Sequence, residues 1–132
     1  MDQLISLFKA LSDEARLRIL HLILEAGALC VCDLQKVLGY TQTKVSRHLA
    51  YLKHAGLLED RREGPWVVYS LAQLSDPHAR TIINDLRVWF DKQPIMRADS
   101  KRLRDLIKQN QCASLRRSEA STNQRQGRPP QA

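Results

Sequence analysis

The sequence predicts a mainly α-helical fold with a small β-hairpin, and three observations support this prediction. Apolar residues recur at helical spacing in several segments that are separated by glycine or proline. Two of these segments, residues 31–38 and 41–54, are joined by a short turn at Gly39. Two strand-like segments, residues 57–62 and 66–71, follow directly and are expected to pair. Two helices, a turn and a hairpin in this order are typical of a winged helix-turn-helix, here with about five to six helices.

Two further helices are expected before this motif. Ser12 is a suitable N-cap for the second of them, and Gly27 is expected to end it in the left-handed conformation. The first helix has an amphipathic pattern formed by Leu4, Leu7, Phe8 and Leu11. The apolar face of the second helix is formed by Ala15, Ile19, Leu20, Ile23 and Leu24.

The predicted recognition helix begins after Thr41, whose hydroxyl is a suitable N-cap, and ends at Gly56. Val45, Leu49 and Leu52 are spaced i, i+4 and i+7, so they form one stripe that we expect to be buried. The opposite face is left to polar side chains. A recognition helix needs both faces, because it must dock on its own domain while it contacts DNA.

The segment after the hairpin turn Glu63-Gly64-Pro65 predicts two more helices. Pro77 is expected to start the fifth helix and Pro94 to end it. A sixth helix is expected over about residues 98–111, followed by a disordered tail rich in Ser, Gln and Arg. The apolar side of the fifth helix is formed by Ile82, Ile83, Leu86, Trp89 and Phe90.

The predicted domains differ in charge. We expect a DNA-binding and dimerisation domain over residues 1–94, a C-terminal helix over 95–112 and a disordered basic tail over 113–132. The 132-residue chain has a net charge of +7, from 21 Lys and Arg and 14 Asp and Glu. Residues 1–96 hold 12 basic and 11 acidic side chains, whereas residues 97–132 hold 9 and 3. The excess favours a polyanionic partner, but most of it lies outside the predicted DNA-binding domain.

Composition and motifs exclude several other classes of protein. Three cysteines without a signal peptide favour reduced thiols in a cytoplasm. The longest apolar run, residues 19–31, contains His21 and Glu25 and is shorter than the roughly 20 residues that span a bilayer, so no membrane segment is expected. The sequence contains no recognisable Ser-His-Asp set, phosphate-binding loop or catalytic carboxylate pair. We therefore expect neither enzymatic activity nor a catalytic cofactor.

The predicted recognition helix carries the side chains that DNA contact requires. Glutamine suits adenine, arginine suits guanine, and hydroxyls suit phosphates or bases. Arg61 and Arg62, beside the hairpin tip, are candidates for contact with a flanking groove or the backbone. His48 lies on the same helix and is included as a candidate, although a packing role also suits it. The outer-face candidates near the start of the helix are Gln42, Thr43, Lys44, Ser46 and Arg47.

Four stretches carry a resemblance to a known family: LFKALSDEARLRIL at residues 7–20, LCVCDL at 29–34, TKVSRHLAYLKHAGL at 43–57 and RREGPWVVY at 61–69. They resemble the ArsR/SmtB family of bacterial metal-responsive repressors, in a match over about residues 4–91. The resemblance implies a homodimer built on the first and fifth helices. It also implies binding to double-stranded operator DNA, with release when a metal ion or metalloid binds. A two-fold dimer would place its recognition helices about 34 Å apart, one turn of DNA.

Cys30 and Cys32 match the Cys-Val-Cys motif of the arsenic-responsive members of this family. Thiolates suit thiophilic ions, so the expected inducer is As(III) or Sb(III), with Cd(II) as an alternative. A helix N-terminus lowers a thiol pKa and so favours the thiolate. Side chains at i and i+2 of a regular helix point about 200° apart. We therefore expect the first turn of this helix to unwind when one ion is bound.

A third ligand is less evident. The three-sulfur version of the family motif has a further cysteine where this chain has Gln35. Cys112 is the remaining thiol, and it either completes the site, from its own or the partner subunit, or is incidental. A small thiol or hydroxide is another candidate for the third position. Other interpretations remain for the cysteines: Cys30 and Cys32 are small buried apolar residues, or the three cysteines form a redox switch. For the protein as a whole, the alternatives are DNA binding without an effector and a small thiol enzyme.

Overall fold

The computed structural model describes residues 1–109, and within this range it contains six α-helices and one three-stranded antiparallel sheet. Predicted features beyond residue 109, including Cys112 and the basic tail, lie outside the described residues. In chain order the elements are α1 (Asp2–Leu11), α2 (Glu14–Ala26), β1 (Ala28–Cys30), α3 (Val31–Leu38), α4 (Gln42–His54), β2 (Leu58–Glu63), β3 (Trp66–Leu71), α5 (Pro77–Phe90) and α6 (Pro94–Lys108).

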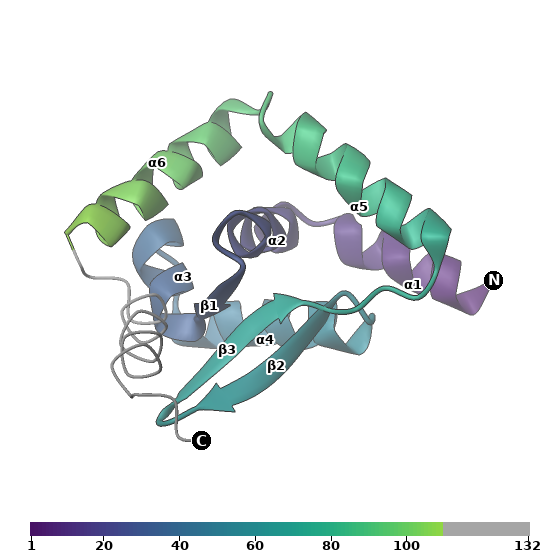
Figure 1. The fold of residues 1–132 in the computed structure, drawn as a ribbon, viewed down its shortest axis with the longest axis horizontal. Helices are drawn as coiled ribbons and strands as arrows, with labels where there is room; N and C mark the ends of the chain where they lie inside the picture. The colour runs from purple at the N-terminus through teal and green to yellow at the C-terminus, as the bar shows by residue number, and fades with distance from the viewer. Residues whose placement is uncertain (110–132) are drawn as a thin grey trace, which may run out of the picture.

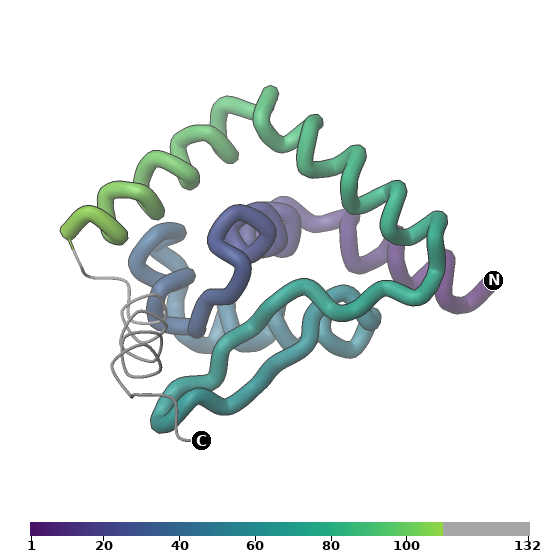
Figure 2. The backbone as a smooth tube through the Cα atoms, in the orientation of Figure 1, coloured from purple at the N-terminus to yellow at the C-terminus, as the bar shows by residue number. Residues whose placement is uncertain are grey.

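Helix α2 lies in the middle of the fold. In Figure 1, α5 and α6 lie above α2 and meet at an angle, whereas α4 and the sheet lie below it. The smooth trace in Figure 2 shows how α6 turns back from the end of α5 toward α3, and α6 packs against both α2 and α3. Leu20, Leu22 and Ile23 of α2 are completely buried, and they join Leu49 and Leu52 of α4 in one apolar core. The core therefore holds the recognition helix against the centre of the domain.

The winged helix-turn-helix architecture predicted from the sequence is confirmed. Helix α3 ends at Gly39, whose φ of 70° and ψ of 19° are left-handed, and the Thr41 hydroxyl caps α4 by accepting from the Lys44 N–H at 3.1 Å. The predicted stripe of Val45, Leu49 and Leu52 is fully buried. These local signals were sufficient because each one acts within about two helical turns.

The sheet contains a strand that the sequence did not predict. The strand order is β1-β3-β2, with Cys30 opposite Val68 and Val68 opposite Arg61. Strand β1 has three residues, too few to show the alternation of apolar and polar side chains that marks a longer strand. The hairpin is also shorter at its tip than expected, because Glu63 belongs to β2 and only two residues connect the strands.

Two helix boundaries differ from the prediction. Helix α2 is capped by Asp13 rather than Ser12: Asp13 has extended backbone angles and its Oδ2 accepts from the Arg16 N–H at 3.0 Å, whereas the Ser12 hydroxyl donates to the Lys9 carbonyl. Pro94 ends no helix but opens α6, because the first turn of a helix has no need of the N–H that proline lacks. Gly27 has a positive φ of 88°, but its ψ of −49° lies outside the left-handed helical region.

Several apolar side chains on α1 and α5 remain exposed. Trp89, which the sequence placed on the apolar side of α5, is 64% exposed, and its neighbour Val88 is 61% exposed. On α1, Phe8 is 54% exposed. Ile83 and Phe90, by contrast, face the core. None of the helices within residues 1–109 combines the length and the apolar character needed to cross a membrane.

Candidate metal centre and nucleic-acid interface

The two cysteines of the Cys-Val-Cys motif meet at the start of α3. Cys30 is the last residue of β1 and the N-cap of α3, with extended backbone angles of φ −90° and ψ 169°. Cys32 lies in the first turn of the helix. Their Sγ atoms are 2.8 Å apart. The expectation that the sulfurs point apart is therefore wrong, because Cys30 is a cap residue and does not follow the helical rotation of about 100° per residue.

Little movement would be needed for both sulfurs to bind one ion. With metal–sulfur bonds of about 2.3 Å, the zinc value, two sulfurs on the same ion lie roughly 3.4–3.8 Å apart. The sulfurs would have to separate by no more than about 1 Å from their present distance. Unwinding of the first turn of α3 is therefore not required. Small rotations of the two side chains, or a small displacement of β1 from α3, would be sufficient.

Asp33 joins the two thiols, a contact that was not predicted from the sequence. The Cys30 thiol donates to Asp33 Oδ2 at 3.2 Å, and the candidate ligand atoms of Cys30, Cys32 and Asp33 all lie within 4.8 Å of one another. Cys30 and Asp33 are buried, and Cys32 is half-buried. The signal that could have identified Asp33 is its position three residues after the cap, where an acidic side chain can reach back to the capping residue.

This arrangement can bind a thiophilic cation. Two sulfurs at the N-terminal end of α3 supply the soft ligands. The carboxylate of Asp33 adds a harder oxygen ligand, which suits divalent ions better than arsenite. Gln35, where the three-sulfur motif has a cysteine, offers no thiol, and Cys112 lies outside the described residues.

The candidate DNA contacts on α4 differ in how far their side chains are exposed. Gln42, Thr43 and Arg47 are exposed, whereas Lys44 and Ser46 are half-buried. The ammonium of Lys44 lies 3.9 Å from the centroid of the Tyr40 ring. The first turn and a half of α4 thus presents a polar surface with two cations, while the opposite side of the helix is in the core.

His48 does not lie on that surface. Only 8% of it is exposed, and its Nδ1 is 3.9 Å from Oδ2 of Asp13, the N-cap of α2. Burial lowers the pKa of His48, as do the nearby charges of Arg16, Arg47 and Lys44, while Asp13 acts in the opposite direction. His48 therefore packs the recognition helix onto the start of α2, since its position is adjacent to the buried stripe.

The hairpin carries the other two candidates. Arg61 and Arg62 are both exposed on β2, and the Arg61 Nε donates to Glu63 Oε1 at 2.8 Å. Because Arg61 lies opposite Val68, and Val68 lies opposite Cys30, one row of the sheet runs from the cysteine site to the wing. The sheet thus connects the candidate metal centre to a candidate DNA contact.

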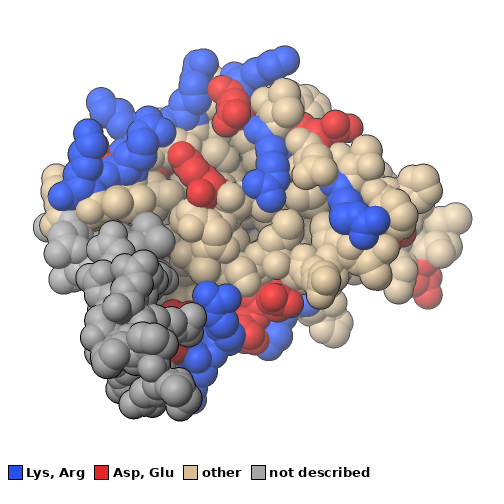
Figure 3. Space-filling view, viewed as in Figure 1, with Lys and Arg blue, Asp and Glu red and all other residues tan. Residues whose placement is uncertain are grey.

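A separate basic surface follows α6. Figure 3 shows Lys and Arg side chains gathered over this helix at the upper left of the view. The exposed basic residues of α6 are Arg97, Lys101, Arg102, Arg104 and Lys108. None of them was among the candidate DNA contacts. Exposed basic side chains are therefore found along α6 as well as on α4 and the hairpin.

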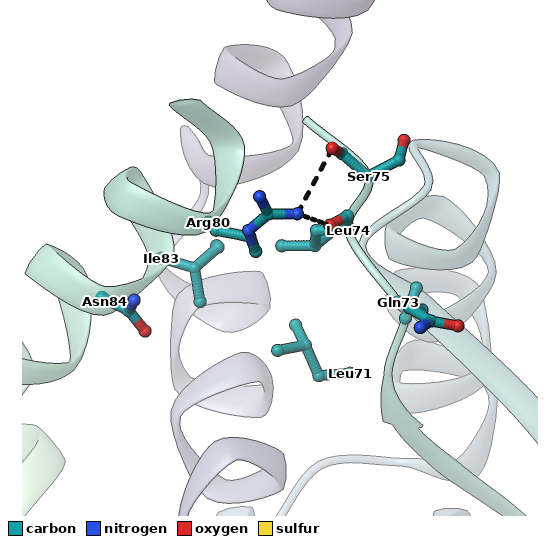
Figure 4. A pocket seen from close by; sticks show the side chains of 8 residues that line it. Leu71, Gln73, Leu74, Ser75, Arg80, Ile83 and Asn84 are labelled. Atoms are coloured by element: carbon teal, nitrogen blue, oxygen red, sulfur yellow. Dashed lines mark hydrogen bonds between the residues drawn. The ribbon is translucent and has the colours of Figure 1, made fainter. Parts of the chain in front are cut away.

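A cavity of about 590 Å³ lies between α5 and the segment that connects it to β3. Figure 4 shows the Arg80 guanidinium pointing across this pocket to the connecting segment, where it donates to the carbonyl oxygens of Leu74 at 2.6 Å and Ser75 at 3.3 Å. Leu71 and Ile83 line its apolar side. The pocket contains no cysteine and no candidate DNA contact, and Arg80 serves to fix the connection between wing and helix.

Known proteins share both the sequence and the fold of this chain. Residues 13–60 match the family described as "Bacterial regulatory protein, arsR family". The arsenical resistance operon repressor of Escherichia coli is 45% identical over 106 residues, which are 80% of this chain and 86% of that protein.

Two solved structures show the same architecture. HlyU from Vibrio cholerae is 32% identical with a TM-score of 0.58, over 67% of this chain and 91% of that one. The homodimeric winged helix-turn-helix DNA-binding domain of Mb0332 from Mycobacterium bovis, a possible ArsR-family regulator, is 31% identical with a TM-score of 0.57, over 69% and 81% of the two chains. With its helix-turn-helix and wing in the expected order, the chain belongs to the ArsR family of bacterial DNA-binding transcriptional repressors.

Proposed function

We propose that this protein represses a metalloid-resistance operon in the cytoplasm and leaves its operator when arsenite or antimonite binds Cys30 and Cys32. The observation that carries the proposal is the pair of sulfurs, 2.8 Å apart, at the N-terminus of the helix that precedes the recognition helix. A relative that is 45% identical is an arsenical resistance operon repressor, which supports the same class of inducer. The proposed DNA contacts on α4 are Gln42, Thr43, Lys44, Ser46 and Arg47, and those on the wing are Arg61 and Arg62.

The position of Cys30 explains how inducer and DNA would compete. Cys30 ends β1, caps α3 and lies in the sheet row that leads through Val68 to Arg61. Binding one ion would separate the two sulfurs by up to about 1 Å, and the proposal is that part of this movement displaces β1 relative to α3. Such a displacement would alter the wing and the helix-turn-helix together. Inducer binding would then favour a conformation in which the wing and α4 no longer match the DNA at the same time.

The third inducer ligand is proposed to be a sulfur for arsenite and an oxygen for Cd(II). Arsenite favours thiolates, so Cys112 from either subunit, or a small thiol, would complete its site. Cd(II) accepts a carboxylate, and Asp33 Oδ2 already lies 3.2 Å from the Cys30 sulfur. Cd(II) is therefore the second candidate inducer, and Asp33 is the residue that favours it.

A homodimer is part of this proposal. Phe8 of α1 and Val88 and Trp89 of α5 are more than half exposed, which is unusual for such large apolar side chains unless they meet a partner. The Mycobacterium bovis neighbour is itself described as homodimeric. We propose that two copies associate through α1 and α5, which would present two recognition helices to successive major grooves.

Titration of operator-bound protein with arsenite, Cd(II), Zn(II) and peroxide, followed by fluorescence anisotropy, tests the proposed inducer. Arsenite is expected to lower the anisotropy, because the protein leaves the DNA. The Cys32→Ser variant should keep the operator affinity of the wild type and lose the response to arsenite.

The same titration distinguishes the alternatives. Release by peroxide alone would contradict the metalloid proposal and favour a redox switch. Cys112→Ser decides the third ligand, since an unchanged arsenite response would remove this residue from the site. Asp33→Asn keeps the side-chain size but removes the anionic ligand, so it should weaken the response to Cd(II) more than the response to arsenite.

A further inference from the structure

A continuous chain of polar contacts runs from α6 to the turn before the recognition helix. It begins at Asp99 of α6, whose side chain is completely buried. Arg18 of α2 donates to both carboxylate oxygens of Asp99, from Nε and Nη2, at 2.9 Å each. The remaining terminal nitrogen of Arg18, Nη1, donates to the Tyr40 hydroxyl at 2.9 Å. Three segments that are distant in the sequence therefore meet at one guanidinium.

Tyr40 connects these polar contacts to Lys44 of the recognition helix. It is half-buried and lies in the turn between α3 and α4, directly before the capping residue of α4. The Lys44 ammonium lies 3.9 Å from the centroid of the Tyr40 ring, within the range of a cation–π contact. The Arg18 guanidinium is also near the ring, with its central carbon 5.3 Å from the centroid.

The ion pair between Arg18 and Asp99 is held rigidly for a physical reason. A buried carboxylate is costly unless its oxygens are hydrogen-bonded, and here Arg18 and Arg102 together satisfy both oxygens of Asp99. The bidentate contact fixes the plane of the Arg18 guanidinium. That plane in turn determines where the Tyr40 hydroxyl can bind, so the ring cannot turn away from Lys44 without losing a hydrogen bond.

We propose that Tyr40 is a positioning residue for DNA binding: held by Arg18 and Asp99, it keeps the ammonium of Lys44 at the N-terminal end of α4, where it can contact a DNA phosphate. Helix α6 then contributes to operator affinity without touching the DNA. The inference rests on the proposed role of Lys44 as a DNA contact and is independent of the proposed inducer. Lysine is a flexible side chain, and restraining it before binding reduces the entropy that DNA binding would otherwise cost.

The test compares Lys44→Gln, Tyr40→Leu, Tyr40→Phe and the double variant Lys44→Gln with Tyr40→Leu, each measured for operator affinity at several salt concentrations. Lys44→Gln should weaken binding about threefold to tenfold and lower the salt slope by about one. Tyr40→Leu should weaken binding by a smaller factor, and the double variant should be no weaker than Lys44→Gln alone. Tyr40→Phe, which keeps the ring but not the hydroxyl, should lie between Tyr40→Leu and the wild type.

Lys101→Gln is the matched control, because it removes one positive charge from the exposed face of α6 at a residue that takes no part in these polar contacts. It should leave operator affinity unchanged. If the losses of operator affinity caused by Tyr40→Leu and Lys44→Gln multiplied in the double variant, the two residues would act independently and the proposal would be overturned. It would also be overturned by a Tyr40→Leu or Tyr40→Phe variant that melts at a lower temperature yet binds the operator as the wild type does. Failure of Lys44→Gln to alter affinity would instead contradict the role of Lys44 as a DNA contact, while leaving the arsenite response to be judged separately.

Discussion

His48 and Asp13 form a contact between the recognition helix and the start of α2, and here burial governs the charge of the imidazole. Burial lowers the pKa of His48 below its ordinary value. For Asp13 burial acts to raise the pKa, but the hydrogen bond from the Arg16 N–H and the charges of Arg16 and His48 outweigh it, so the pKa is lowered. The folded protein therefore favours a neutral histidine beside an ionised aspartate.

This pair predicts a pH dependence of stability. Because the pKa of His48 is lower in the folded state, the unfolded chain binds its proton more readily once the pH falls below about 6.5. The contribution of His48 to the free energy of unfolding is thus present above that pH and is lost as the pH falls. His48→Gln should show a smaller decrease in unfolding free energy between about pH 7.5 and pH 5.5 in urea denaturation. His54→Gln, an exposed histidine on the same helix, is the control, and an equal effect there would contradict this assignment.

Among the elements, α4 combines a buried stripe with a polar start. Arg47 is the exposed arginine of that helix, about one and a half turns after its first residue, in the N-terminal part from which a recognition helix contacts base edges. Arg47→Ala should weaken operator binding by about 1–3 kcal/mol if the side chain reads a base. The measurement is fluorescence anisotropy with operator and with random duplex. An equal loss on both duplexes would mean that Arg47 contacts phosphate only.

Strand β1 and helix α3 show how neighbouring elements determine the chemistry of a site. In an isolated helix, Cys30 and Cys32 would point in nearly opposite directions. Pairing of Cys30 with Val68 in β3 holds Cys30 in extended conformation, so the helix begins only after it. The two sulfurs meet because a strand ends and a helix starts between them. This juxtaposition depends on a strand contributed by residues almost 40 positions later in the chain.

At the scale of the whole molecule, the exposed apolar side chains of α1 and α5 predict that the protein is a dimer. Trp89→Glu would place a charge in the proposed interface, where it could not be solvated. The variant should sediment as a monomer in analytical ultracentrifugation and bind a two-half-site operator much more weakly than the wild type. Ile107→Glu, at a 40% exposed position on α6, should remain dimeric. If Trp89→Glu also remained dimeric, α5 would not form the interface.

The buried ion pair between Arg18 and Asp99 also contributes to the arrangement of the whole molecule. It joins residues 81 positions apart and holds α6 against α2. A second connection between these helices lies nearby, where the His21 Nε2 is 2.8 Å from the Ser100 hydroxyl and that hydroxyl donates to Glu25 at 2.6 Å. Helix α6 is thus packed into the domain, whereas the prediction was a separate C-terminal helix over residues 95–112.

Local patterns in the sequence were sufficient for the helices, the Thr41 cap, the buried stripe of α4 and the hairpin, because each depends on residues within a few positions of one another. The same locality explains two mistakes: Ser12 and the neighbouring Asp13 compete for one cap, and a proline such as Pro94 can either follow one helix or open the next. Cys30 and Cys32 were identified by the family resemblance, but their geometry was not.

The sequence by itself determined the winged helix-turn-helix and its polar recognition face, since short-range periodicity and capping encode both, whereas the thiol pair was identified by the resemblance of its motif to a known family. Only the tertiary structure decided that the sulfurs lie side by side, that Asp33 joins them and that His48 faces inward. It also decided that Arg18 links Asp99 to Tyr40. Apart from the local contact of Asp33 with Cys30, these features depend on packing between segments far apart in the chain, and such packing leaves no periodic signal in the sequence.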